Sequence, residues 1–329
     1  HIHRSSLLAD MFKKKFNLNS VLLMRKDSAA LEYATKRGLL FQEVPVLQPQ
    51  EEGKWIKEYA VQNNIVLCVL DILDNDQDAD FIGQLKSLKC PIVAITDDSN
   101  QHPIDADIIV NGNPNQIGYD YTNYPGTYLL GAKYFLMDER YSNFLSLREP
   151  HRIQRILLTL GGSDHNNLMF RVIEALQRLQ CKKELVIVAS IASGYIDRLK
   201  NVLLESELRF QMLLDVPSLV DLWPSVDVAI TAGGNTLFER IAAGKPGVTI
   251  CQLHRQMEIA ECFERMGVNK DLGFSNDLSV ESLAHGLKKF LEDEKGLAGQ
   301  ASLCRQVCAG EGLNHLAQSL RPIVLGEKR

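Results

Sequence analysis

The sequence lacks any apolar run close to the length of about twenty residues that a membrane-spanning helix needs. Its longest apolar stretches, such as IVLCVL at 65–70, have the length of a β-strand. It also lacks an excess of positive charge, because 36 lysines and arginines stand against 41 aspartates and glutamates, giving a formal net charge of −5. These absences argue against an integral membrane segment and against nucleic acid as a partner, since nucleic-acid binders normally carry a basic stripe.

The seven cysteines show no pairing or metal-binding pattern. Their number is odd, no two have the C-x-x-C spacing, and several lie inside apolar runs. We therefore expect reduced, mostly buried thiols in a cytoplasmic protein rather than a disulfide framework or a zinc site. The chain opens on HIHRSSLLADMFKKKF, without an initiator Met or a signal-peptide pattern, and we expect a segment upstream of this numbering.

Apolar runs alternate with segments of helical periodicity over nearly the whole chain. The predicted strands cover 20–24, 39–44, 65–71, 91–96, 107–111, 155–160, 184–190, 209–214, 227–231 and 247–250. The predicted helices cover 4–16, 27–37, 49–63, 78–88, 165–180, 195–205, 217–224, 235–243, 255–266, 278–293 and 313–320. The strands are uniformly apolar rather than alternating, which is typical of a parallel sheet covered on both faces.

The length of 329 residues indicates about two domains, and the charged, proline-containing segment 148–154 is typical of a linker. We expect an N-terminal domain at 1–150 and a C-terminal domain at 151–329. The fold class is α/β, with two doubly wound, Rossmann-like domains that face each other across a cleft. Ligands of such sheets bind beyond the carboxyl ends of the strands, so the residues after each strand are the candidate site residues.

The loop in VAITAGGNTLFE has the composition of an anion-binding turn. Gly233 and Gly234 have no Cβ, so another group can approach the main chain closely. Asn235 or Thr236 is expected to cap the next helix, whose first amides and positive dipole end attract anions. Glu239, one turn into the helix, is placed to accept hydrogen bonds from a ribose diol. For this loop alone, a tight strand–helix turn with an exposed glutamate is the better interpretation.

The loop in LLTLGGSDHNN repeats the pattern at the first strand of the same domain. Gly161 and Gly162 follow an apolar run, and Ser163 and Asp164 come next as caps. Two such loops at neighbouring strand ends suit a diphosphate, because helix-start amides bind phosphate without net positive charge. Neither loop has the G-x-G-x-x-G or P-loop spacing, so neither a dinucleotide site nor an ATP site is specifically indicated.

The start of the chain is the third candidate, because His1 and His3 lie where a helix begins. A helix N-terminus lowers the pKa of a nearby imidazole, which suits a general base near neutral pH. An incidental histidine is the alternative, and the spacing alone favours it.

Five blocks in the sequence resemble a known family. In order they are HIHRSSLLAD, LLGAKYFLMDERY, LLTLGGSDHNN, DVPSLVDLWPSVDVAITAGGNTLFERIAAGKPGVTI and RQMEIAECFERMGV. Together they resemble the nucleotide-sugar hydrolase of the pseudaminic acid pathway and its spore-coat polysaccharide biosynthesis relatives. These proteins belong to the GT-B superfamily, with the lipid-intermediate N-acetylglucosaminyl transferase of peptidoglycan synthesis. The resemblance covers nearly the whole chain and is most specific over 213–268.

The resemblance implies a set of site residues. The family's first loop is G-x-G-H-x-x-R, and His1 and Arg4 match its last four positions, which makes His1 the implied catalytic residue. The implied substrate-binding residues are Arg4, Gly161, Gly162, Ser163, Val216, Gly234, Asn235, Thr236, Glu239 and Gln256. The glycine loops would face the phosphates, Glu239 the ribose, the main chain around Val216 the uracil edge, and Gln256 the sugar or diphosphate.

Three carboxylates of the first domain, Asp71, Asp97 and Asp98, end predicted strands and are expected to line the sugar side. The pair Asp97–Asp98 is also compatible with a metal site. Solvated loop carboxylates are the preferred interpretation, because enzymes of the GT-B superfamily generally work without a bound metal. We expect no cofactor.

The leading hypothesis is inverting hydrolysis of a UDP-linked amino sugar in bacterial surface-glycan biosynthesis. His1 would deprotonate the attacking water, and helix-start amides would stabilise the leaving UDP. The alternative is an inverting GT-B glycosyltransferase that uses the same donor and an acceptor hydroxyl; a non-catalytic nucleotide-sugar binding protein is a third. The stretch MFKKKF would suit a lipid acceptor, although a solvated helix face is the ordinary interpretation of three lysines.

Overall fold

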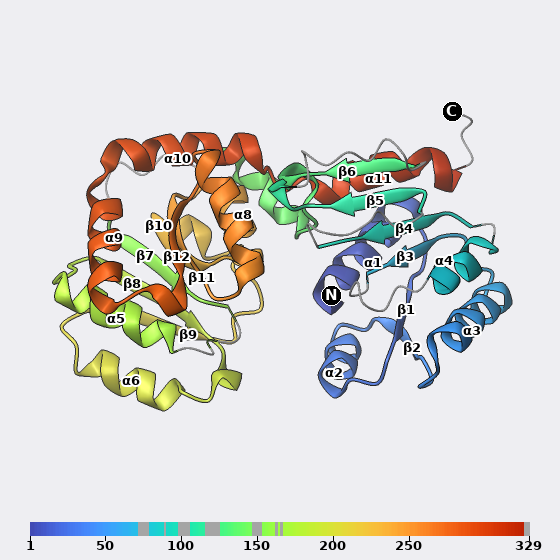
Figure 1. Ribbon diagram of the computed structural model, residues 1–329, viewed down its shortest axis with the longest axis horizontal. Coiled ribbons are helices and arrows are strands. Elements are labelled where there is room, and N and C mark those ends of the chain that lie inside the picture. The colour runs from blue at the N-terminus through green and yellow to red at the C-terminus, as the bar shows by residue number, and fades with distance from the viewer. Residues whose placement is uncertain are drawn as a thin grey trace. The chain divides into compact units, whose positions relative to one another are not determined.

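The structure is a computed structural model that describes residues 1–71, 79–88, 90–97, 106–115, 126–146, 153–161, 164 and 167–325. Of the residues singled out in the sequence, Asp98, Gly162 and Ser163 lie outside these ranges. The chain folds into two compact units. The first unit comprises His1–Asp138 and Glu311–Arg329, and the second comprises Glu139–Gly310 (Figure 1).

The described residues of the first unit form six parallel strands in two sheets. The strands are β1 (Val21–Met24), β2 (Leu40–Glu43), β3 (Cys68–Leu70), β4 (Ile92–Ile95), β5 (Ile108–Asn111) and β6 (Thr127–Leu130). Its helices are α1 (Ile2–Phe16), α2 (Ser28–Lys36), α3 (Pro49–Gln62), α4 (Ala79–Lys86) and α11 (Gly312–Leu325). β3 to β6 form one sheet in chain order, and β1 pairs with β2 in a separate one.

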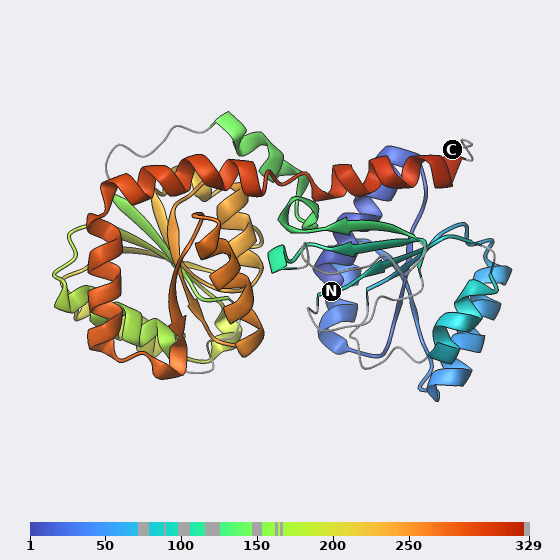
Figure 2. The ribbon, with the colours of Figure 1, turned by 45° about the horizontal axis from the view of Figure 1, so that its top comes forward.

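Helices α1 and α11 pack against the sheet β3–β6 (Figures 1 and 2). Both carry apolar residues at helical spacing, so each presents one apolar stripe to the sheet. The buried members of this cluster on the two helices are Leu7, Leu8, Met11, Phe12, Leu313, Leu316, Ala317 and Leu320. Complete burial of one such leucine is worth about 1.5–3 kcal/mol, so this packing fixes where α1 begins relative to the strand ends.

The second unit contains one six-stranded parallel sheet in the order β12-β11-β10-β7-β8-β9. Its strands are β7 (Arg155–Thr159), β8 (Glu184–Ala189), β9 (Arg209–Leu214), β10 (Val228–Ala232), β11 (Gly247–Cys251) and β12 (Lys270–Phe274). Its helices are α5 (Leu168–Arg178), α6 (Ile196–Leu204), α7 (Asn235–Ala242), α8 (His254–Arg265), α9 (Val280–Glu292) and α10 (Glu294–Val307). Across the described residues of both units, no helix combines the length and the apolarity that a bilayer crossing requires.

The strand order of the second unit reverses between β7 and β10. The chain moves outward from β7 to β9 on one side and from β10 to β12 on the other. Because such crossovers are right-handed, α5 and α6 cover one face of the sheet and α7 and α8 cover the other. Ligands of doubly wound sheets bind at this reversal. β7 pairs directly with β10, so the glycine loops that follow these strands are neighbours, as the sequence predicted.

Some elements differ from the prediction. Residues 217–224 form no α-helix; a single 3-10 turn covers Trp223–Ser225, where the Leu222 carbonyl accepts the Ser225 N–H at 2.9 Å and the Trp223 carbonyl accepts the Val226 N–H at 3.4 Å. β6, β12 and α10 were not predicted. β6 has only four residues and follows a tyrosine- and asparagine-rich segment, and β12 (KDLGF) is too polar to show as an apolar run.

The division of the chain also differs from the predicted boundary at residue 150. The 3-10 helix Glu139–Ser146 belongs to the second unit, where the Tyr141 hydroxyl accepts a hydrogen bond from the buried Trp223 indole at 3.1 Å. The last helix, α11, belongs to the first unit because its apolar stripe packs against α1 and the sheet β3–β6. The predicted linker at 148–154 lies mostly outside the described residues.

Candidate functional site

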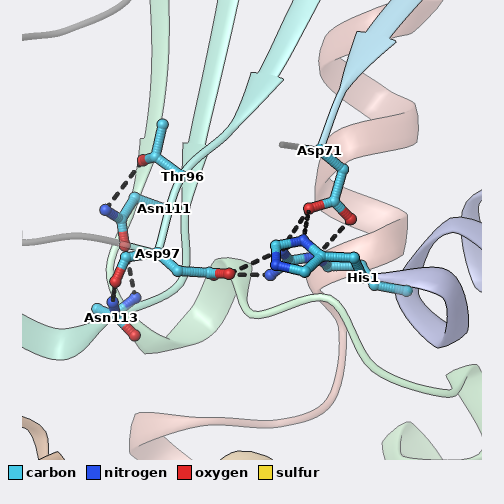
Figure 3. A network of polar contacts seen from close by, with 7 residues as sticks. His1, Asp71, Thr96, Asp97, Asn111 and Asn113 are labelled. Carbon is cyan, nitrogen blue, oxygen red and sulfur yellow. Dashed lines mark hydrogen bonds and ion pairs between the residues drawn. The ribbon is translucent and has the colours of Figure 1, made fainter. Parts of the chain in front are cut away.

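The start of α1 and two strand ends converge in the first unit. α1 begins at Ile2, two residues before the predicted start, and His1 is its N-cap residue. Arg4 follows His1 by three residues, so the two side chains share one face of the helix. Asp71 follows β3 and Asp97 follows β4, which are neighbouring strands. Figure 3 shows the side chains of His1, Asp71 and Asp97 pointing toward one another.

These four side chains form one charged network. His1 Nδ1 lies 2.7 Å from Asp71 Oδ1. Arg4 donates to Asp71 from Nε at 2.9 Å and from Nη2 at 2.5 Å. The same guanidinium donates to Asp97 from Nη1 and from Nη2, both at 2.7 Å. Asp71 is 6% exposed and His1 is 42% exposed, so a buried carboxylate holds an accessible imidazole.

The network raises the pKa of His1 above its ordinary value. The hydrogen bond with Asp71 is the largest cause, and the charges of Asp71 and Asp97 add to it, against partial burial and the nearby Arg4 charge. Burial works to raise the pKa of Asp71, but the hydrogen bonds from His1 and Arg4 outweigh it and hold that pKa below its usual range. The predicted lowering of the His1 pKa was wrong, because the carboxylates outweigh the helix N-terminus.

The ionised state of Asp71 decides which imidazole nitrogen carries the proton. A carboxylate only accepts hydrogen bonds, so His1 must donate from Nδ1. In the neutral ring the lone pair is then on Nε2, which has no hydrogen-bond partner among the described residues. The arrangement therefore provides an exposed base whose orientation is fixed by a buried acid.

A second layer of polar groups holds the Asp97 segment. Asn113 donates from Nδ2 to the Asp97 carbonyl at 2.6 Å, and its N–H donates to Asn111 Oδ1 at 2.9 Å. Asn111 in turn donates to Thr96 Oγ1 at 3.1 Å (Figure 3). Asn111 and Asn113 are almost fully buried. Neither residue was among the candidate site residues, although asparagines that follow the apolar run DIIV were a visible signal.

His3 does not take part in this network. Its Nδ1 lies 3.0 Å from the Tyr33 hydroxyl, and the two rings meet edge to face. Burial, together with the charge of Arg37, lowers the pKa of His3. Only His1 of the two predicted histidines therefore has the partner that a positioned base requires.

In the second unit, the start of α5 is closed by a protein carboxylate. Asp164 accepts from the N–H of Leu168 and of Met169, both at 2.9 Å, and it is only 8% exposed. Asp164 thus accepts from the first amides of the helix, as predicted, although the N-cap residue is Asn167 and the helix begins at Leu168 instead of residue 165. A buried negative charge already occupies the first amides of α5, so this helix start is poorly suited to a phosphate. Gly161, at the end of β7, has a positive φ of +84° and open space around its Cα.

The start of α7 has no such cap. Its N-cap residue is Gly234, and among the described residues no side chain caps the helix. The prediction that Asn235 or Thr236 supplies the cap was wrong, because both lie inside the first turn instead of at the N-cap position. The amides of this turn thus lack the side-chain acceptor that α5 has. Of the two glycine loops, the one before α7 retains the character of an anion site.

Gly233 and Gln256 fit closely against each other. A Cβ at Gly233 would lie 2.8 Å from Gln256 Cβ, which is too near for any other residue. Gln256 Oε1 accepts from the N–H of Gln252 at 2.8 Å and of Leu253 at 3.3 Å. A Cβ at Gly234 would lie 3.7 Å from Gln256 Nε2, so the amide nitrogen is the end nearest the loop.

Arg240 lies on the buried side of α7 and ties this helix to neighbouring loops. This side chain is fully buried and donates to the Lys245 carbonyl at 2.7 Å and to Asn269 Oδ1 at 2.9 Å. Burial lowers the pKa of Arg240 to about 10. These bonds tie α7 to the loops before β11 and β12 and so fix the direction in which its first turn points.

Glu239 and Val216 are both half-buried. Val216 follows Asp215, whose carboxylate accepts from Ser190 Oγ and from the Ile191 N–H, both at 3.0 Å, and so joins the loops after β8 and β9. The ligand contacts predicted for both residues, and for Gly161, Gly234, Asn235, Thr236 and Gln256, stay predictions.

The comparison with curated proteins finds two distant relatives, while no protein-family model matches the chain. The spore coat polysaccharide biosynthesis protein SpsG of Bacillus subtilis (strain 168) is 27% identical over 154 residues, 45% of this chain and 45% of that protein. An uncharacterized protein of Methanocaldococcus jannaschii is 25% identical over 270 residues, 78% of this chain and 54% of that protein. The chain thus spans about half the length of these relatives.

Solved structures share the fold over nearly the whole chain. MurG of Acinetobacter baumannii has a TM-score of 0.76 at 13% identity and covers 98% of this chain and 96% of its own. The spinosyn rhamnosyltransferase SpnG with thymidine diphosphate scores 0.64 at 14% identity, with 98% and 96% covered. MnaA of S. aureus with UDP scores 0.63 at 11% identity, with 100% and 95% covered. The predicted GT-B fold, with parallel α/β sheets in two domains, is confirmed.

The network predicts how the His1 pKa responds to the loss of Asp71. The charge and the hydrogen bond of Asp71 raise the His1 pKa. Because Asp71→Asn removes that charge, we expect the His1 pKa to fall below the wild-type value. An NMR titration of the imidazole Cε1–H resonances measures this change in the full-length protein. His3 serves as the internal control and should titrate unchanged in both proteins. A His1 pKa that stays the same or rises would contradict the described geometry.

Proposed function

We propose that this protein is an inverting enzyme that acts on a UDP-sugar in surface-polysaccharide biosynthesis and transfers the glycosyl group to an acceptor hydroxyl. In this proposal the second unit binds the nucleotide and the first unit supplies the base. The observation that carries it is the His1–Asp71 pair, in which Nδ1 is held and Nε2 is left without a partner among the described residues.

The base step uses the geometry of the first unit. Neutral His1 accepts the proton of the attacking hydroxyl at Nε2. The hydroxyl oxygen bonds to C1 of the sugar, and the bond between C1 and the diphosphate oxygen breaks with its electron pair on UDP. A single displacement of this kind inverts C1. Asp71 stabilises the resulting imidazolium, because its hydrogen bond and charge favour the protonated ring.

The departing diphosphate gains negative charge, and the loop before α7 is suited to stabilise it. Backbone amides at an uncapped helix start point toward a bound anion and need no reorganisation during the reaction. Gly233 and Gly234 leave the main chain accessible at this point. We assign Asn235 and Thr236 to the phosphates, and Glu239 to the ribose diol.

Transfer is preferred to hydrolysis because proteins of the same fold include a rhamnosyltransferase with a bound nucleoside diphosphate. SpsG, the relative named for spore coat polysaccharide biosynthesis, supports a role in polysaccharide synthesis. Hydrolysis of a UDP-linked amino sugar is the second candidate, and the match of His1 and Arg4 to the H-x-x-R end of the resembled family's first loop favours it. Water then replaces the acceptor hydroxyl, and His1 keeps the same role.

Replacement of His1 tests the proposed chemistry in the full-length protein. His1→Ala should lower kcat for UDP release by about a hundred- to ten-thousandfold, the usual contribution of a positioned general base. Its Kd for UDP should stay unchanged, because the nucleotide is assigned to the second unit. The measurement is UDP release from a panel of UDP-sugars, with EDTA and with candidate acceptors.

His3→Ala is the matched control, because His3 lies in the same helical turn and outside the charged network. Its kcat should stay close to that of the wild type, and equal losses in the two variants would contradict the role of His1. Mass spectrometry of the products separates the two reactions: a glycosylated acceptor supports transfer, and free sugar in every acceptor mixture supports hydrolysis.

A single negative charge tests the proposed anion site before α7. Asn235→Asp places a carboxylate in the first turn, which favours the helix by about 0.3–1 kcal/mol. The same charge repels a diphosphate, so we expect the Kd for UDP to rise by about tenfold or more, equivalent to at least 1.4 kcal/mol. Calorimetric titration with UDP measures the affinity, and urea unfolding measures the stability.

Asn167→Asp is the matched control, because Asn167 is the exposed N-cap residue of α5, whose first amides Asp164 already occupies. This variant should bind UDP as the wild type does. An equal loss of UDP affinity in both variants would show that both helix starts bind the phosphates. Unchanged affinity in both variants would contradict an anion site before α7.

A further inference from the structure

Arg4 makes hydrogen bonds that leave it little capacity to bind a substrate. A guanidinium has five N–H donors. Four contacts within 2.9 Å go to Asp71 and Asp97, two to each carboxylate. The side chain is 17% exposed. The resemblance implied a substrate-binding role, but the donors that such a role needs are already engaged.

The paired contacts fix both carboxylates in orientation as well as in position. A guanidinium fork binds a carboxylate through two parallel bonds in one plane, which a lysine cannot reproduce. Arg4 holds Oδ1 and Oδ2 of Asp71, and Oδ1 is also the acceptor of His1. The plane of the Asp71 carboxylate, and with it the direction of the His1 ring, is therefore set by Arg4.

Asp97 anchors the other side of Arg4. Its carboxylate is 52% exposed, but its main chain is held by the buried Asn113 side chain at the end of β5. Arg4 thus bridges the ends of β3 and β4 through Asp71 and Asp97, and this bridge lies beside His1 on the same face of α1.

We propose that Arg4 is a positioning residue that acts on His1 through Asp71, with Asp97 as its second anchor, and that it is not a ligand of the substrate. The inference rests on the proposed function for its kinetic consequence only. Its structural part concerns the imidazole alone and is measurable without any substrate.

The pKa of His1 separates positioning by Arg4 from an effect of its charge alone. Around His1 the charged groups among the described residues are Arg4 on α1, Asp71 after β3 and Asp97 after β4. The Arg4 charge lowers the pKa of His1, so loss of that charge alone would raise it. Loss of the paired bonds to Asp71 instead weakens the hydrogen bond between Asp71 and His1, which is the largest cause that raises the pKa, so the pKa should fall. Arg4→Lys keeps the charge and loses the paired bonds, and it therefore isolates positioning.

The experiment compares Arg4→Gln, Arg4→Lys and Asp97→Asn in the full-length protein by NMR titration of His1. We expect the His1 pKa to fall below the wild-type value in Arg4→Lys, which keeps the charge and loses the paired bonds to Asp71. We also expect a fall in Asp97→Asn, which removes the second anchor and a charge that raises this pKa. In Arg4→Gln the lost charge and the lost positioning act in opposite directions, so its His1 pKa should lie above that of Arg4→Lys. Thermal unfolding checks that each variant is folded. If Arg4→Gln does not fold, Arg4→Lys and Asp97→Asn, which changes a half-exposed side chain, still decide the outcome. A His1 pKa at or above the wild-type value in Arg4→Lys, or an unchanged one in Asp97→Asn, overturns the proposal.

The kinetic arm separates positioning from substrate binding. Misplacement of a reacting group by about 1 Å costs on the order of a hundredfold in rate, so kcat of Arg4→Lys should fall by about this factor. KM for the UDP-sugar should stay unchanged, because Arg4 does not touch it. A rise in KM with unchanged kcat would make Arg4 a substrate ligand and overturn the proposal. If no UDP-sugar is turned over by the wild type, the proposed function fails while the titration still tests the role of Arg4.

Discussion

The paired hydrogen bonds between Arg4 and the buried Asp71 carboxylate are the constraint on which the candidate base depends. A carboxylate that is 6% exposed is costly unless both oxygens have partners, and Arg4 and His1 together supply three donors. Because His1 and Arg4 belong to α1 and the carboxylates follow β3 and β4, the apolar packing of α1 on the sheet determines the geometry of the imidazole. The packing of α1 on the sheet, the ion pairs of Arg4 and the orientation of His1 therefore depend on one another.

In the second unit, the corresponding constraint acts on the main-chain amides at two helix starts. Its two glycine loops follow paired strands, yet their helix starts differ in charge. Asp164 neutralises the start of α5, while α7 begins on Gly234 with no side-chain cap. The close fit of Gly233 against Gln256 and the buried bonds of Arg240 hold this open helix start in place. The anion site proposed before α7 therefore depends on the absence of a capping side chain as much as on the residues that are present.

The sequence predicted the parallel α/β architecture, since long apolar runs between amphipathic segments are directly visible. It predicted His1 and both glycine loops from local composition and a family resemblance. It did not predict that Arg4 pairs with Asp71, because 67 residues separate them and only sheet order brings them together. The direction of the His1 pKa shift was wrong for the same reason: the helix N-terminus is a local feature and the carboxylates are not. The assignment of α11 to the first unit could not be predicted either, because its apolar residues pack against α1 and the sheet β3–β6, which are far away in the sequence.

The central claim is that Asp71 holds the proton on His1 Nδ1 and leaves the Nε2 lone pair for catalysis. The most direct test is the tautomeric state of the neutral His1 ring, read from its imidazole nitrogen-15 chemical shifts at a pH above the titration. The account predicts a protonated Nδ1 with a pyridine-like Nε2. A protonated Nε2, with Nδ1 as the bare nitrogen, would contradict it.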